Sequence, residues 1–299
     1  MKAPPVMPPG PSVPPVIPAP GEGAGEGSHA RRAPRWAWLT MLGLMLGYIV
    51  VMTALAARHK DSGPAMSGEV GALMRESSAS LGVFAIPFGL GLACVWRGRG
   101  DLWGQRAHNL WTWTWGTVWF VGLRMAAAVP VLVAAVVLQW RHGTEGMEKI
   151  KGLRPKIESL MPLESLGEPL YALACVTWIS FVVAGLREEL WRAAFLRGFR
   201  ALFPGEGRSP FIPWAGVVVS SALFGLAHVS QGWMGVALTT VLGLGLGAVQ
   251  VARRSTWEAV VAHGLVDAST FFLLFVLQNP TTQRWLQLPP NFAKQVLGG

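Results

Sequence analysis

Seven stretches of this chain are apolar over roughly 20 residues, the length that an α-helix needs to cross the hydrocarbon core of a bilayer. They lie near residues 36–57, 79–96, 112–139, 168–187, 211–229, 234–252 and 257–278. In lipid, a segment must satisfy its backbone hydrogen bonds internally, so such runs fold as helices. The sequence therefore predicts an all-α polytopic membrane protein with about seven to eight transmembrane helices.

The composition agrees with a membrane protein and argues against a nucleic-acid partner. Of 299 residues, 52% are hydrophobic and only 14% are charged, far from the balance of a soluble domain. The formal net charge is +9, but Lys and Arg gather at the ends of the apolar runs, where they suit anionic lipid headgroups. Cys94 and Cys175 both lie in apolar segments, so we expect neither a disulfide framework nor a cysteine metal site.

The chain divides into five parts by composition. Residues 1–35 form a proline-rich tail that we expect to be disordered, because it cannot pack a core. The other parts are an N-terminal group of transmembrane helices (36–140), a polar connecting segment that is either an interfacial helix or a loop (141–167), a second helical group (168–278) and a C-terminal tail (279–299). Residues 188–203 are predicted to continue the fourth span as a helix.

Basic residues predict the orientation. The clusters Arg31-Arg32, Arg97-Arg99 and Arg253-Arg254 all fall on one side if the amino terminus is cytoplasmic. Because positive loops stay in the cytoplasm, we expect the two ends of the chain on opposite sides of the membrane.

Two histidines, His228 and His263, lie within the apolar stretches, whereas the other four fall in polar or connecting segments: His29, His59, His108 and His142. Each buried histidine has a neighbour one helical turn away on the same face, Phe224 before His228 and Asp267 after His263. Ionisable groups at membrane depth are costly, so they indicate a functional site. A purely structural role stays open for each histidine: a hydrogen bond to a neighbouring carbonyl for His228, and a local ion pair with Asp267 for His263.

A third polar element is the run Arg187-Glu188-Glu189-Leu190-Trp191-Arg192 at the end of the fourth span. Glu188 and Arg192 are four residues apart and are predicted to pair along the helix, with Glu189 about 100° away. Taken alone, this run could equally be an interfacial charge cluster.

Together the three elements resemble the CPBP (Abi, or CAAX-protease) family of intramembrane proteases. That family's pattern is a Glu-Glu motif closing with Arg, then Phe-x-x-x-His, then His-x-x-x-Asn/Asp, in this order on successive spans. The resemblance covers roughly residues 168–278 and includes the glycine run 243–247. It implies a catalytic helical core that hydrolyses a peptide bond inside the bilayer, in a membrane-anchored protein or peptide, as in CAAX-like C-terminal processing or sorting. We expect this integral, multi-pass protein in the inner membrane of a bacterium.

One departure concerns the first motif. The family places its arginine five residues after the first glutamate, whereas Arg192 follows Glu188 by four. Glu188 occupies a motif glutamate whether the sequences are aligned on the arginine or on the glutamates. We therefore predict Glu188 as the base, with Glu189 as its substitute.

The resemblance implies a glutamic-type mechanism with the catalytic residues Glu188, Glu189, Arg192, His228, His263 and Asp267. Glu188 would deprotonate a water that His228 also holds, while His263 and the residue four further on stabilise the oxyanion. Asp267 replaces an amide in that last position, and because an ionised carboxylate cannot donate, it is better suited to orienting His263.

We expect no cofactor, and zinc is the alternative. Two histidines and a carboxylate would suffice for a catalytic zinc, although the sequence has no His-Glu-x-x-His. A different class of function is a non-catalytic membrane binding, chaperone or immunity protein whose polar pocket recognises a peptide; a proton or cation carrier is a third. Arg124, in the middle of the third span, is predicted to snorkel or to pair with a carboxylate such as Asp267.

Overall fold

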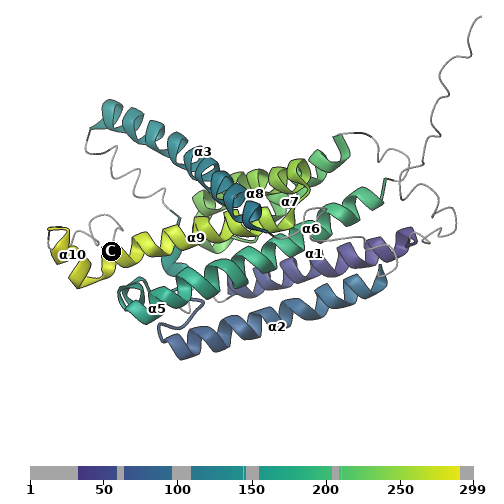
Figure 1. Ribbon diagram of the computed structural model, residues 1–299, viewed down its shortest axis with the longest axis horizontal. Helices are drawn as coiled ribbons and strands as arrows, with labels where there is room; N and C mark the ends of the chain where they lie inside the picture. The colour runs from purple at the N-terminus through teal and green to yellow at the C-terminus, as the bar shows by residue number, and fades with distance from the viewer. Residues whose placement is uncertain are drawn as a thin grey trace, which may run out of the picture.

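The computed structural model describes residues 33–58, 64–95, 109–143, 145, 155–203, 209 and 211–289. These residues form a bundle of helices with no β-strand among them (Figure 1). Within this part of the chain, six helical segments are long and apolar enough to cross a membrane, which confirms the all-α membrane fold: 35–55, 70–94, 110–142, 169–201, 229–253 and 256–278. Residues 1–32 of the predicted tail and 290–299 lie outside the described residues.

The first three spans begin near or before their predicted positions. Helix α1 is Arg35–Arg58, α2 is Val70–Cys94 and α3 is Leu110–His142. The predicted start of α2, residue 79, is nine residues late because Arg75, Glu76 and Ser77 interrupt the apolar run. The buried Ser77 hydroxyl is satisfied within the helix, because it donates to the Met74 carbonyl (3.2 Å).

The fourth span continues past its apolar part, as predicted. It comprises α5 (Pro169–Ala174), the π-helical segment η3 (Cys175–Leu186) and α6 (Arg187–Ala201) without a break. Pro169 suits the first turn, where its missing N–H is not needed. In η3 each backbone bond reaches one residue further than in an α-helix, so the side chains that follow are rotated relative to an α-helical register.

Helix α7 (Phe211–Leu226) is short. Its 16 residues span about 24 Å, less than the roughly 30 Å of a bilayer core. It ends before His228, whereas the apolar pattern predicted a helix to residue 229. The turn η5 (Val229–Gln231) leads into α8 (Gly232–Arg253), which packs closely against α7: a Cβ on Gly225 would lie 1.9 Å from Thr240 Oγ1.

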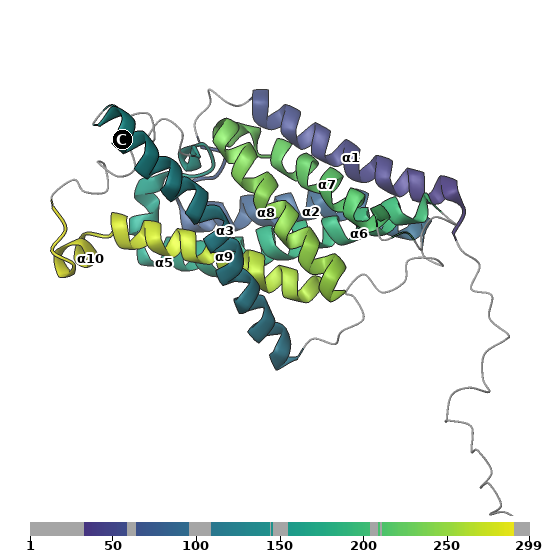
Figure 2. The same ribbon diagram turned by 90° about the horizontal axis from the view of Figure 1, so that it is seen from above.

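Helix α9 (Thr256–Gln278) is central to the bundle. The Ser255 side chain caps its start by accepting from the Glu258 N–H at 3.2 Å. It packs against η3, α3 and α8. In both ribbon views α3 crosses over it (Figures 1 and 2). The chain then turns into the short helix α10 (Pro280–Trp285).

The described part of the polar connection forms two 3-10 turns, η1 (Ile157–Ser159) and η2 (Leu163–Gly167). The Lys156 N–H donates to the Gln231 carbonyl at 3.0 Å, so this connection lies beside the α7–α8 turn. Residues 144 and 146–154 of the connection lie outside the described residues.

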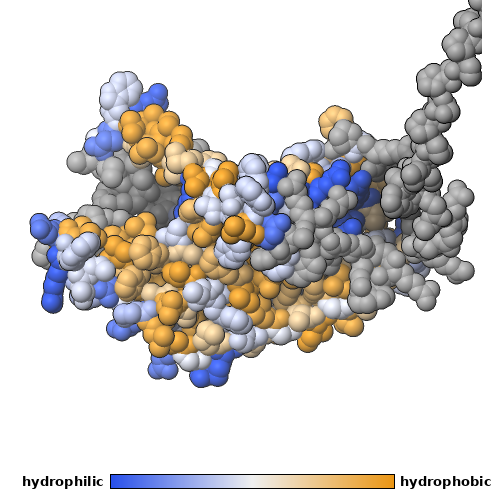
Figure 3. Space-filling model, viewed as in Figure 1, coloured by the Kyte–Doolittle hydropathy of each residue, from blue (hydrophilic) through white to orange (hydrophobic). Residues whose placement is uncertain are grey.

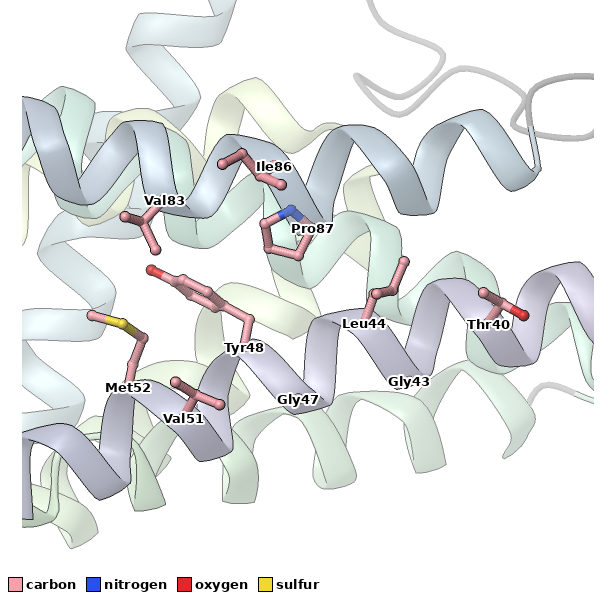
Figure 4. A pocket seen from close by; sticks show the side chains of 10 residues that line it. All are labelled: Thr40, Gly43, Leu44, Gly47, Tyr48, Val51, Met52, Val83, Ile86 and Pro87. Carbon is pink, nitrogen blue, oxygen red and sulfur yellow. The ribbon is translucent and has the colours of Figure 1, made fainter.

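Apolar side chains cover much of the face seen in Figure 3, as expected of a surface in contact with lipid. An open apolar groove lies between α1 and α2, with Gly43 and Gly47 on one wall and Val83 and Pro87 on the other (Figure 4). Tyr48 stands between the two helices in this groove.

Candidate active site

The glutamates of α6 and the histidine of α9 come together because η3, which leads into α6, packs closely against α9 on both sides of His263. A Cβ on Gly264 would lie 2.4 Å from a ring carbon of Phe181, and one on Gly185 would lie 3.1 Å from the Val260 carbonyl. Two glycines facing a neighbouring helix allow the backbones to pack at this distance, as is common in membranes. The contact brings α6 and His263 within hydrogen-bonding reach.

Glu189 is fully buried, and both of its carboxylate oxygens are engaged. Its Oε1 accepts from His263 Nδ1 at 2.9 Å and from Arg192, and its Oε2 accepts from Gln250 Nε2 at 2.8 Å. Three helices, α6, α8 and α9, therefore meet at one carboxylate. Because all its partners donate, this buried group acts as an acceptor whose two oxygens are both held by protein donors.

The partner of Arg192 differs from the prediction. Arg192 pairs with Glu189, three residues before it, and not with Glu188. It is fully buried, its guanidinium lies 4.7 Å from the centre of the Phe224 ring, and its Nε and Nη2 have no hydrogen-bond partner. Glu188 pairs instead with Arg187, whose Nη2 lies 2.8 Å from Oε1.

Glu188 keeps one oxygen open. Its Oε1 is held by Arg187, which also donates to Ser80 Oγ of α2 at 3.0 Å. Its Oε2 lies 3.8 Å from His263 Nε2, too far for a direct hydrogen bond but close enough for both atoms to contact one water. The side chain keeps 18% of its surface exposed, so protein does not enclose it as it encloses Glu189.

His228 lies at the end of α7, where the last turn tightens and its N–H bonds the Gly225 carbonyl at 2.9 Å. Its Nδ1 lies 2.7 Å from the Phe224 carbonyl. A carbonyl can only accept, so Nδ1 carries the proton and Nε2 of the neutral ring presents a lone pair. The half-buried ring lies within electrostatic range of both Glu188 and Asp267.

His263 is the centre of the cluster. Its Nδ1 faces Glu189, and its Nε2 faces Glu188 and also Asp267, whose Oδ2 is 3.6 Å away. The adjacent glutamates thus face opposite nitrogens of one ring, Glu189 at Nδ1 and Glu188 at Nε2. The structure brings together all six predicted residues, with Arg192 behind Glu189 rather than beside Glu188.

Three contributors were not foreseen from the sequence. Gln250 binds Glu189, while Arg187 and Ser80 hold Glu188. Ser80 also interacts with Tyr48 of the α1–α2 groove. Gln250 could have been found from the sequence, because it is an amide within an otherwise apolar span and such a group needs a buried partner.

Arg124 of α3 binds α9 rather than snorkelling. Its Nη2 donates to Ser269 Oγ (2.6 Å), the Val266 carbonyl and the Thr270 hydroxyl. Asp267 lies within electrostatic range, but it forms no ion pair with Arg124 in the described part of the chain.

The arrangement of donor atoms determines whether the cluster can hold a metal ion. Among the described residues, no three His, Cys, Asp or Glu side chains converge as a group that could hold a metal ion. Both oxygens of Glu189 already accept hydrogen bonds from protein donors, and one oxygen of Glu188 accepts from Arg187.

Residues 170–269 match the family model described as type II CAAX prenyl endopeptidase Rce1-like. The match confirms, over this part of the chain, the resemblance to the CAAX-protease family that the three motifs indicate. The description of that family names a prenyl endopeptidase, and the six apolar helices of the described residues agree with an integral multi-pass membrane protein. No curated protein and no solved structure matches the chain.

Proposed function

We propose, with the Rce1-like match of residues 170–269 as the premise, that this protein hydrolyses a peptide bond within the bilayer by means of a water activated by Glu188. The observation that carries the proposal is the asymmetry of the glutamate pair. Glu189 has both oxygens engaged, whereas Glu188 has one oxygen directed at the Nε2 of His263. Only Glu188 is therefore suited to act on a water.

Water activation requires a base and a second group that orients the water. Glu188 Oε2 would take the proton, and its other oxygen is fixed by Arg187, so the carboxylate has one direction in which to act. His228 Nε2, with its lone pair, would accept the second hydrogen of the same water. The hydroxide equivalent then attacks the carbonyl carbon of the scissile bond.

The oxyanion that forms needs donors. His263 would donate from Nε2 when both ring nitrogens carry protons, since Nδ1–H is already directed at Glu189. Asp267, 3.6 Å from that Nε2, is suited to hold the ring's orientation and balance its charge. Glu189 and Arg192 would support His263 from behind without touching the substrate.

The substrate that we propose is the C-terminal segment of a membrane-anchored protein or peptide, in keeping with the family description. The bacterial inner membrane is the proposed location. Among the described residues, the carboxylates and histidines of the cluster do not form a three-ligand metal site, so the proposed mechanism uses no metal. Zinc content of the purified protein, measured with the cleavage rate before and after chelation, tests this: a rate that falls with zinc loss and returns with zinc would contradict the glutamic mechanism.

The decisive experiment compares the C-termini of membrane proteins in cells that carry the wild type, Glu188→Gln or His228→Ala. We expect shortened C-termini with the wild type alone. His142→Ala is the matched control, because His142 lies exposed at the end of α3 and should leave processing intact. Continued processing by the Glu188 and His228 variants at normal protein levels would refute the proposal.

A non-catalytic peptide-binding protein is the competing function, favoured by the open Oε2 of Glu188 beside His263, which also suits it to accept a hydrogen bond from a peptide N–H. It predicts that Glu188→Gln preserves both the cellular phenotype and capture of the partner. Loss of the phenotype with partner binding retained would exclude it.

A further inference from the structure

Glu188 is held by an arginine that directs its two terminal nitrogens at different partners. Arg187 Nη2 lies 2.8 Å from Glu188 Oε1, and Nη1 donates to Ser80 Oγ at 3.0 Å. An arginine and a carboxylate frequently pair through two parallel N–H···O bonds, one to each oxygen. In this pair the second nitrogen binds Ser80 instead, and Glu188 Oε2 faces His263 Nε2 at 3.8 Å. The open oxygen of Glu188 therefore depends on where Arg187 Nη1 is bound.

Ser80 lies on α2, outside residues 170–269 that match the family model. Its hydroxyl also hydrogen-bonds Tyr48 of α1, which stands between the two helices in the apolar groove (Figure 4). A serine hydroxyl has one hydrogen and two lone pairs, so Ser80 can bind Arg187 and Tyr48 at the same time. The Tyr48 ring is itself packed edge-on against Phe84, with 5.5 Å between the ring centres. Helices α1 and α2 thus present a fixed acceptor to Arg187.

Loss of this acceptor would change how Arg187 binds the carboxylate. Both side chains are largely buried, with 19% of Arg187 and 18% of Glu188 exposed, so an unpaired charged donor is costly here. Rotation of the guanidinium onto Glu188 Oε2 would complete the two-bond fork and satisfy Nη1. Both oxygens of Glu188 would then be bound by Arg187, and Oε2 could no longer take a proton from a water.

We propose that Ser80 is a positioning residue: it keeps Arg187 bound to one oxygen of Glu188 and so leaves the other oxygen free to act as the base. Tyr48 supports this role by holding the Ser80 hydroxyl. Neither side chain is assigned a contact with the substrate. The inference rests on the proposed endopeptidase function, and it brings α1 and α2, which lie outside the family match, into the mechanism.

The test measures kcat and KM of the full-length protein in proteoliposomes, with a synthetic peptide that carries a farnesylated cysteine followed by three apolar residues. Ser80→Ala should lower kcat by about tenfold or more, a part of what a general base contributes, and leave KM within about twofold of the wild type. Ser80→Thr keeps the hydroxyl and should retain most of the wild-type kcat. Tyr48→Phe keeps the ring but not its hydroxyl, and its kcat should lie between those of Ser80→Ala and the wild type.

Ser77 offers the matched control, because it lies one helical turn from Ser80 and also bonds the fourth span. Its hydroxyl accepts from Trp178 Nε1 of η3 at 3.0 Å. Ser77→Ala removes this equivalent tie, so we expect a lower melting temperature with kcat within about twofold of the wild type. Tyr171→Phe is the corresponding control for Tyr48→Phe, because the Tyr171 hydroxyl donates to a backbone carbonyl and should leave kcat unchanged.

A double-mutant cycle distinguishes this role from a purely structural one. Arg187→Lys replaces the planar fork by a single ammonium group, which lacks the pair of parallel donors. In the Arg187→Lys background, Ser80→Ala should therefore change kcat by less than about twofold. An equal loss of kcat in both backgrounds would overturn the inference, because Ser80 would then act independently of the fork.

The inference also fails, with the proposed function intact, if Ser80→Ala keeps the wild-type kcat or if Ser77→Ala lowers kcat as strongly. This comparison is decisive even if Arg187→Lys does not accumulate, and Tyr48→Phe against Tyr171→Phe serves in the same way if Ser80→Ala does not. Unaltered cleavage by Glu188→Gln would overturn the proposed function and the inference with it. If the wild type does not cleave the peptide, both fall for this substrate class.

Discussion

Glu188 and Glu189 are chemically identical neighbours whose surroundings give them opposite tasks. Glu189 accepts from donors on three helices, whereas Glu188 keeps one oxygen without a direct hydrogen bond. The expected consequence is that the same substitution at the two positions affects different properties of the protein.

Glu188→Gln should lower the cleavage rate by about 10²- to 10⁴-fold, the usual contribution of a general base, while the melting temperature stays near that of the wild type. Glu189→Gln leaves Arg192 buried without a counter-charge and should cost about 3–5 kcal/mol of stability. Thermal unfolding and cleavage assays on both variants in the same detergent test this. Equal loss of stability in the two variants would contradict the division of tasks.

Gln250→Leu should leave Glu189 Oε2 without a donor. We expect a loss of about 1–3 kcal/mol in stability and a reduced but measurable cleavage rate, because Gln250 holds Glu189 and not the water. The control is Gln139→Leu at an exposed position of α3, which should change neither property. An unaltered melting temperature in Gln250→Leu would show that its hydrogen bond to Glu189 adds little.

At this scale the sequence predicted six members of the cluster, but neither the three further contributors nor every pairing. Arg192 could reach either glutamate, since helix spacings of three and four both bring side chains together. The choice depended on Arg187, which takes Glu188, and on the burial of Glu189 against α8 and α9. Those competing contacts come from tertiary structure, which no local spacing reports.

Among the elements, the contact between η3–α6 and α9 determines whether the cluster forms at all. Gly264→Leu would place a side chain into the Phe181 ring and separate the helices that carry Glu188 and His263. We expect cleavage to be lost and stability to fall by at least about 1–3 kcal/mol, as for other overpacked sites.

Gly82→Leu is the matched control, because a Cβ on this α2 glycine has no neighbour within 4 Å. It should unfold and cleave like the wild type. Full activity in Gly264→Leu would show that the close packing of η3 against α9 does not position the site.

Helix boundaries were predictable where the apolar pattern coincides with the backbone, as in α1 and α9. They were missed where side chains alter the ends. Polar residues hid the first turns of α2, and the tightened last turn of α7 put His228 beyond the helix rather than within it. The π-helical register of η3 has no counterpart in the apolar periodicity, because a wholly apolar run looks the same in either helix type.

At the scale of the whole molecule, the number of membrane crossings depends on whether the short helix α7 spans the bilayer. If α7 crosses the membrane despite its 16 residues, the chain makes seven crossings and its two ends lie on opposite sides. With a cytoplasmic amino terminus, Arg58 and Trp285 would then face outward and Phe203 inward.

Single cysteines at these three exposed positions, in a background with Cys94 and Cys175 changed to Ala, test the topology. An impermeant maleimide should label Arg58→Cys and Trp285→Cys in intact cells, and Phe203→Cys only after permeabilisation. Labelling of Trp285→Cys and Phe203→Cys from the same side would rule out a crossing by α7. The apolar runs predicted the overall architecture because the bilayer admits few alternatives for such segments.

The saturated carboxylate at the junction of α6, α8 and α9 also bears on how this protein could be redesigned. A substitution at Glu189 would have to be matched on three helices at once, so random libraries that include it would consist mostly of inactive members. Diversity is better confined to positions of the α1–α2 groove such as Gly43 and Gly47, where a Cβ would meet nothing within 4 Å and the cluster stays assembled.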